Sequence, residues 1–83
     1  MDRYIPSSKA LGIVIKNQRK LKKLTQTEAG SPFGLEQSTV SNLEKGASGV
    51  RLDTLFRMLA ALDLEMVIRT KDIASKGGWK EEW

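Results

Sequence analysis

The stretch LTQTEAGSPFGLEQSTVSNLEKG, residues 24–46, predicts two short helices joined by a tight turn. Thr25 can cap the first of them, with Glu28 three residues later in the spacing of a capping box. Gly34 suits a turn that needs a positive φ. The second helix, expected over about residues 37–44, carries mostly polar side chains and few apolar ones to bury. Such a helix is suited to presenting hydrogen-bonding groups to the major groove of DNA.

Longer helices are expected on either side of this stretch. The first should run over about residues 9–22, capped by Ser7 or Ser8, whose hydroxyl can accept an orphan backbone N–H. Its buried stripe comprises Leu11, Val14, Ile15, Gln18 and Leu21. Either this stripe ends near Gln18 or the Gln18 side chain finds a polar partner. The other helix should span about residues 52–62, with a buried stripe of Leu52, Leu55, Phe56, Leu59 and Leu62.

Gly30 and Pro32 disturb the short helix that follows Thr25. Glycine lowers helix propensity, and a proline inside a helix costs about 3 kcal/mol. We therefore expect this helix to be short or distorted near its end, with Phe33 packing into the core.

Residues 64–70, LEMVIRT, change from a helical period to alternation, which is a strand pattern. A lone strand has an open edge, and pairing with the same strand of a second subunit would close it. The alternative is a last helical turn that runs into a disordered tail. The dimerisation candidates on the strand are Leu64, Met66, Val67 and Ile68. Further apolar surface that a partner could cover comes from Met58, Ala60 and Ala61.

The pattern divides the chain into an N-terminal arm over residues 1–8, a helix-turn-helix and dimerisation domain over residues 9–70, and a flexible tail over residues 71–83. The tail ends in WKEEW. Trp79 and Trp83 are unfavourable in water, and tryptophan is enriched at interface hot spots. They are therefore candidates for docking a protein partner.

Composition disfavours several classes of function. The 83 residues include no cysteine and no histidine, which removes disulfides, thiolate zinc sites and the commonest general base. The ten carboxylates are scattered, so we expect neither an enzyme, nor a metal site, nor a cofactor. No apolar run is long enough to span a bilayer, and the first residues do not resemble a signal peptide, which predicts a cytoplasmic protein without a membrane partner.

The net charge of +4 is unevenly distributed. Between Lys9 and Lys23 there are six basic residues and no acidic one. Basic charge beside a predicted helix-turn-helix favours contact with phosphates, although a solvated helix face is the alternative. A domain this small buries little core, so we expect dimerisation to add to its stability.

A spaced pattern runs through these helices: Arg19, Leu24-Thr25-Gln26, Gly34-Leu35, Gln37-Ser38-Thr39-Val40-Ser41, Leu43-Glu44 and Gly46. With it, the chain resembles the Cro/repressor-like (XRE) helix-turn-helix family over about residues 11–62. The segment TLFRMLAALDLEMVI, residues 54–68, is more particularly similar to HipB-type antitoxins of toxin–antitoxin systems. The resemblance implies a mostly α, four- to five-helix domain whose short C-terminal strand pairs across a homodimer.

The resemblance also implies roles for individual residues. Gln26 would bond a phosphate and brace Gln37. The candidate DNA-binding set adds Glu36 and two lysines of the basic run to the residues that the resemblance implies, and consists of Gln26, Glu36, Gln37, Ser38, Thr39, Ser41, Asn42, Lys45, Lys16 and Lys20. Arg19 would form a structural ion pair with Glu44 that holds the first helix on the third. A direct phosphate contact is the alternative for Arg19.

A HipB-type protein would be a dimeric repressor, nucleoid-associated, that binds an inverted-repeat operator in double-stranded DNA and autoregulates its operon. It would also restrain a HipA-like kinase toxin, with Trp79 and Trp83 as candidate contacts. Two alternatives stay open: a free-standing or phage-type regulator without a toxin, and a protein-interaction adaptor that has lost DNA binding. Departures from the family pattern favour the adaptor, namely Gly30, Pro32 and the acid Glu36, which repels phosphates although it can accept from cytosine.

Overall fold

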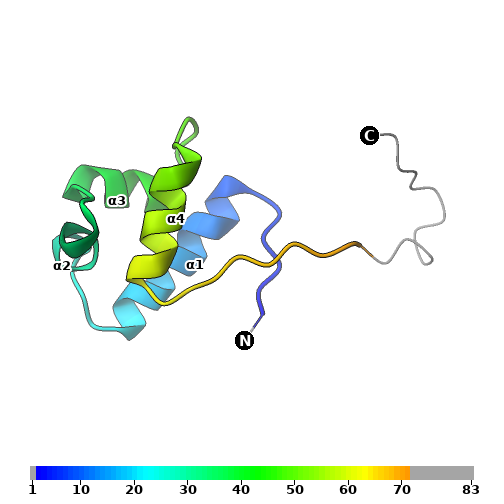
Figure 1. The fold of residues 1–83 in the computed structure, drawn as a ribbon, viewed down its shortest axis with the longest axis horizontal. Coiled ribbons are helices and arrows are strands. Elements are labelled where there is room, and N and C mark those ends of the chain that lie inside the picture. Colours follow the sequence, from blue (N-terminus) through cyan, green and yellow to red (C-terminus); the bar gives the residue numbers. More distant parts are fainter. Residues whose placement is uncertain (1, 72–83) are drawn as a thin grey trace.

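The computed structural model describes residues 2–71, which form four α-helices and one short 3₁₀ helix (Figure 1). In chain order these elements are α1 Ser8–Leu21, α2 Gln26–Gly30, η1 Ser31–Phe33, α3 Gln37–Lys45 and α4 Leu52–Ala61. The mostly helical fold is therefore confirmed. No strand occurs within residues 2–71, so the strand over residues 64–70 and its pairing across a dimer stay predictions.

Both predicted helix caps are present. The backbone N–H of Ala10 donates to Ser7 Oγ over 3.1 Å, so Ser7 caps α1. At the start of α2, Glu28 N–H donates to Thr25 Oγ1 over 3.1 Å, and Thr25 N–H donates to Glu28 Oε1 over 2.8 Å. This reciprocal pair is a complete capping box, which satisfies two otherwise unpaired backbone donors.

The short, interrupted second helix is also confirmed. α2 ends at Gly30 and continues as the single 3₁₀ turn η1, whose first turn holds Pro32 where the missing N–H costs nothing. Gly34 follows with φ 74°, in the left-handed region that glycine adopts most readily. The expected burial of Phe33 is wrong, because this residue is 41 % exposed. The tighter winding of η1 changes which residues face inward, and Leu35 fills the core after the turn instead.

A single core joins all four α-helices. Its wholly buried side chains are Ile15, Val40, Met58 and Leu62, and the smaller or nearly buried ones are Ala29, Leu35 and Leu43. Gln18 lies at the edge of this core, and its Nε2 donates to the backbone carbonyl of Leu62 over 3.1 Å. The predicted polar partner of Gln18 is therefore the C-terminal end of α4.

Two of the predicted buried stripes need correction. Leu21 is the last residue of α1, beyond the core, and is 72 % exposed. On α4, Leu52 and Phe56 are exposed, whereas Met58, expected to widen the stripe, is wholly buried. The stripe that packs inward follows the spacing i, i+3, i+4, i+7 and consists of Leu55, Met58, Leu59 and Leu62.

The chain leaves α4 as an extended segment that passes the N-terminal arm (Figure 1). There Arg69 Nη1 lies 3.8 Å from Asp2 Oδ2. Leu64 packs against the core of its own chain, but the remaining predicted dimerisation residues, Met66, Val67 and Ile68, are exposed. No helix within residues 2–71 combines the length and the apolarity that crossing a membrane requires.

Candidate nucleic-acid interface

α3 presents a polar face to solvent because its apolar side chains share one side. Val40 and Leu43 are buried in the core, with Leu35 beside them. The side chains predicted to contact DNA occupy the rest of the surface. Exposed among them are Glu36, Gln37, Ser38, Asn42 and Lys45, and half-buried are Thr39 and Ser41. The helix thus offers hydroxyl, amide, carboxylate and ammonium groups along one accessible face.

A chain of hydrogen bonds connects the start of α3 to the core. Gln37 Nε2 donates to Gln26 Oε1 over 2.5 Å, and Gln26 Nε2 donates to Glu44 Oε1 over 3.1 Å. Glu44 also accepts from Arg19, whose Nε lies 2.5 Å from Oε2 and whose Nη2 lies 3.0 Å from Oε1. The exposed amide of Gln37 is therefore held, through α2, by a buried charged pair between α1 and α3.

The ion pair between Arg19 and Glu44 is bidentate and nearly closed to solvent, with residue exposures of 9 % and 8 %. Arg19 Nη1 donates in addition to the carbonyl of Leu24 over 2.9 Å. The guanidinium therefore holds α1 against α3 and the turn before α2. This buried position contradicts the alternative in which Arg19 contacts a phosphate.

Protonation equilibria reflect the same arrangement. Burial raises the pKa of Glu44, but hydrogen bonds from Arg19 and Gln26, together with the charges of Arg19 and Lys16, outweigh burial and leave the pKa of Glu44 below its ordinary value. The hydrogen bond to Glu44 raises the pKa of Arg19. Both groups are therefore ionised at neutral pH, as a buried pair requires.

The basic residues of α1 differ in what they contact. Lys16 is exposed and close enough for its charge to act on Glu44, which places it beside the hydrogen-bond chain. Lys20 is exposed as well, and among residues 2–71 no hydrogen bond joins it to that chain. Lys22 is occupied elsewhere, because its Nζ lies 2.6 Å from Asp63 Oδ2 at the end of α4.

Two glycines that the sequence did not mark as packing contacts set the approach of these helices. A Cβ placed on Gly12 would lie 2.5 Å from the carbonyl oxygen of Glu44, so α1 meets the backbone of α3 directly. A Cβ on Gly30 would lie 2.8 Å from Val40 Cγ2. The only available signal was a glycine within a helical pattern, which lowers helix stability and says nothing by itself about packing.

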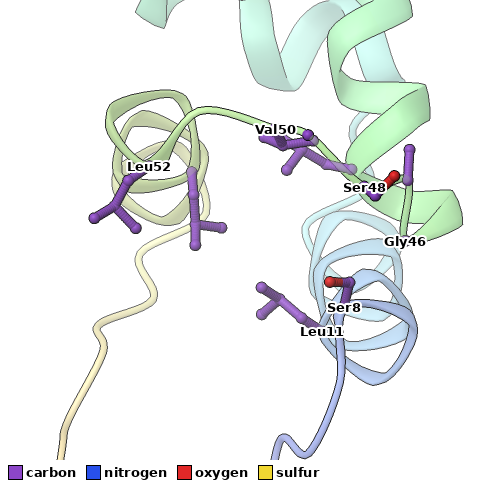
Figure 2. A pocket seen from close by; sticks show the side chains of 10 residues that line it. Ser8, Leu11, Gly46, Ser48, Val50 and Leu52 are labelled. Atoms are coloured by element: carbon purple, nitrogen blue, oxygen red, sulfur yellow. The ribbon is translucent and has the colours of Figure 1, made fainter.

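A separate apolar hollow of about 180 Å³ lies between the N-terminal end of α1, the loop after α3 and α4 (Figure 2). Leu11 lines it from α1, Leu52 from the start of α4, and Val50 from the loop between α3 and α4. Its lining contains the hydroxyls of Ser8 and Ser48 but no ionisable side chain. The hollow therefore offers neither a general base nor a charged group that could hold a polar ligand.

The family model described as helix-turn-helix matches residues 15–68. This range contains the whole hydrogen-bond chain from Arg19 to Glu44, and all of α2, α3 and α4. The chain belongs to the helix-turn-helix family. The resemblance to its HipB-type members is also confirmed, by relatives in sequence and in structure.

This helix-turn-helix protein is 35 % identical over 74 residues to the ImmF control region 10 kDa protein of Bacillus phage phi105, an alignment that covers 86 % of this chain and 82 % of the phage protein. It is 36 % identical over 44 residues to the antitoxin HipB of Escherichia coli K12, covering 53 % of this chain and only half, 50 %, of HipB. A structure of a HipA-HipB-O2-O3 complex contains a chain that superposes with a TM-score of 0.79 at 30 % identity, covering 86 % of this chain and all of that one.

Proposed function

We propose that this protein is a sequence-specific DNA-binding transcriptional repressor, and that α3 is the helix that enters the major groove. The observation that carries the proposal is the polar face of α3, anchored to the core by Gln37, Gln26 and Glu44. Immobilised amides and hydroxyls are the groups that distinguish base pairs in the major groove. The proposal includes no catalytic step, and it places the protein at the nucleoid in the cytoplasm.

Phosphate contacts would come from the second helix and from the basic face of α1. Gln26 uses one N–H on Glu44 and its oxygen on Gln37, which leaves its second N–H free to donate to a phosphate. The ammonium groups of Lys16, Lys20 and Lys45 are exposed and would add salt-sensitive affinity. Ser38, Thr39, Ser41 and Asn42 would then contact bases or the backbone along the groove.

The proposed active form is a homodimer on an inverted-repeat operator. Val67 and Ile68 are 72 % and 90 % exposed on a segment that already runs extended, which supports pairing with the same segment of a second copy. Two α3 helices would then enter successive major grooves about 34 Å apart on one face of the duplex.

We further propose that the protein is an antitoxin that restrains a HipA-like kinase toxin and represses the operon they share. The support is the similarity to HipB, including the HipB-like chain of the HipA-HipB-O2-O3 complex. Trp79 and Trp83 remain the proposed toxin contacts, and they lie outside the described residues.

The phage relative supports a second candidate, a regulator without a toxin, because its alignment covers more of this chain than that with HipB does. Purification of the native protein at low salt, followed by mass spectrometry, separates the two. A kinase-like protein that co-purifies in a stoichiometric ratio favours the antitoxin, and a preparation with no such protein favours the free-standing regulator.

DNA binding itself is tested by fluorescence anisotropy with the duplex immediately upstream of the protein's own coding sequence. A scrambled duplex of the same composition is the control, and both are titrated over a salt series. A repressor keeps its preference for the upstream duplex as salt rises. Equal binding to both duplexes that disappears at physiological salt would instead support the adaptor without DNA specificity.

A further inference from the structure

Glu36 stands at the N-terminal end of α3. In helix-turn-helix proteins, the N-terminal residues of the recognition helix contact base edges. It occupies the N-cap position with φ −77° and ψ 157°, yet its side chain makes no capping hydrogen bond. It is exposed, and it takes part in none of the ion pairs found among residues 2–71. Both oxygens of its carboxylate are therefore available to a ligand in front of α3.

The side-chain amide of Gln37, next to Glu36, already makes a hydrogen bond within the protein. Gln37 donates one N–H to Gln26, and Gln26 donates in turn to Glu44. Among the described residues, Glu36 is therefore the charged acceptor at this end of α3 that makes no capping hydrogen bond and no ion pair. The structure thus places an unpaired carboxylate at the end of α3 that would approach a base pair in a DNA-binding protein.

A carboxylate accepts hydrogen bonds and cannot donate them when ionised. In the major groove only two base groups donate, the N4 amine of cytosine and the N6 amine of adenine. Adenine presents its N7 acceptor beside that amine, and guanine and thymine present acceptors alone. An unpaired carboxylate is therefore attracted to cytosine and repelled by the edges of guanine and thymine.

We propose that Glu36 is a specificity-determining residue that selects a cytosine in each half of the operator. This inference rests on the proposed repressor function and adds the base that one named side chain recognises. Glu36 also weakens binding to every sequence, because its charge faces the phosphates. It therefore raises specificity by penalising incorrect sites rather than by raising total affinity.

The test is selection from duplexes randomised over about 20 base pairs, a length that holds two half-sites one helical turn apart. Full-length wild type is compared with Glu36→Gln, in which the amide adds a donor and suits adenine. The charge-matched control is Asp53→Asn, which removes an exposed carboxylate from the first turn of α4, beyond the other end of α3. Circular dichroism checks that each variant folds, as expected for side chains that cap no helix.

Wild type and Asp53→Asn should enrich the same inverted repeat, with a C·G pair at one position in each half-site. Glu36→Gln should lose that preference or exchange it for A·T, a change on the order of 10- to 100-fold in relative affinity, while the other positions stay the same. It should also bind scrambled duplex more tightly than wild type and Asp53→Asn do.

Two results would overturn the inference, and they differ in what else they affect. If Glu36→Gln enriches the same sequence as wild type, Glu36 reads no base, but the repressor function stands. If wild type enriches no sequence at all, the repressor function fails and the role of Glu36 fails with it.

Discussion

At the scale of single residues, Gly12 sets how closely α1 can approach α3. The atoms that a Cβ on Gly12 would meet belong to the backbone of Leu43 and Glu44, which cannot rotate away as a side chain can. The ion pair between Arg19 and Glu44 lies about two helical turns further along α1, so both contacts depend on the same close crossing.

Gly12→Ala should lower the free energy of unfolding by about 3 kcal/mol or more, the upper end of the range for overpacked cores. The matched control is Gly34→Ala, where a Cβ meets nothing within 4 Å and only the φ of 74° opposes the substitution. That control should lose about 1–2 kcal/mol. Urea denaturation measures both, and a smaller loss for Gly12→Ala than for Gly34→Ala would contradict the close crossing.

Glu44 gives the fold a predictable dependence on pH. Its pKa in the folded protein lies below its ordinary value of 4.5. As pH falls, the unfolded chain therefore binds this proton before the folded protein does, and stability that is present above pH 4.5 is lost on acidification. At neutral pH, Glu44→Gln should cost roughly 3 kcal/mol, because the buried guanidinium of Arg19 loses its counter-charge.

The difference in unfolding free energy between wild type and Glu44→Gln should shrink as the pH is lowered from neutral through 4.5. Comparing the two proteins cancels the contribution of the other carboxylates. Urea denaturation at each pH provides the measurement. A difference that stays constant down to acid pH would show that Glu44 is not ionised more easily in the folded state than in the unfolded chain.

Residue patterns predicted the caps at Ser7 and Thr25 because a cap depends on side chains only three residues apart. Pairing of Arg19 with Glu44 followed from the family resemblance, since nothing local connects residues 25 positions apart. The burial of Phe33 was wrong for a related reason. Whether a residue beside a proline faces inward depends on the exact winding of η1, which composition does not specify.

At the scale of elements, α2 acts as a bridge between the core and α3. Although it has only one turn and a half of helix, its capping box fixes the start, and Gln26 bonds forward to Gln37 and inward to Glu44. The predicted disturbance by Gly30 and Pro32 is present, but it falls after Gln26. α2 therefore ends early, at Gly30, without displacing Gln26, on which Gln37 depends.

Gln26→Ala should weaken binding to the selected operator by about 1–3 kcal/mol, because Gln37 loses its support and a phosphate loses a donor. The stability of the fold should fall by about 1.5–3 kcal/mol, the contribution of one hydrogen bond to the ionised Glu44. Thr27→Ala, one residue further on the exposed side of α2, serves as the control. Operator affinity that is equal in Gln26→Ala and Thr27→Ala would remove Gln26 from the interface.

The position of α4 was predicted well, but its rotation was not. Leu52, Leu55, Phe56, Met58, Leu59 and Leu62 are all apolar, and several stripes fit that set. Only packing against Ile15 and Val40 selects the stripe through Met58 and leaves Phe56 exposed. Periodicity therefore identifies this helix, whereas the choice of its buried face needs the rest of the core.

At the scale of the whole molecule, the segment that follows α4 has no strand partner within the described part of the single chain. Residues 65–71 are exposed and have no regular secondary structure, although their alternation predicts a strand. A strand that pairs only with its copy cannot be recognised within one chain. This is why the predicted strand is neither confirmed nor contradicted by the fold of the monomer.

Proline substitution tests the proposed strand pairing. In a paired strand, adjacent N–H groups point to opposite edges, so either Met66→Pro or Val67→Pro removes a donor from the dimer ladder. At least one of them should sediment as a monomer at a concentration where Val67→Ala remains a dimer. Two proline variants that both remain dimeric would rule out pairing through this segment.

Methylation interference with dimethyl sulfate tests whether paired α3 helices read the major groove. The selected operator is partially methylated at guanine N7, which lies in the major groove, and at adenine N3, which lies in the minor groove. Methylation at N7 should block binding at two clusters about 10 base pairs apart on one face of the duplex, and methylation at N3 between them should not. Interference confined to adenine N3, or absent from both positions, would mean that α3 does not enter the major groove.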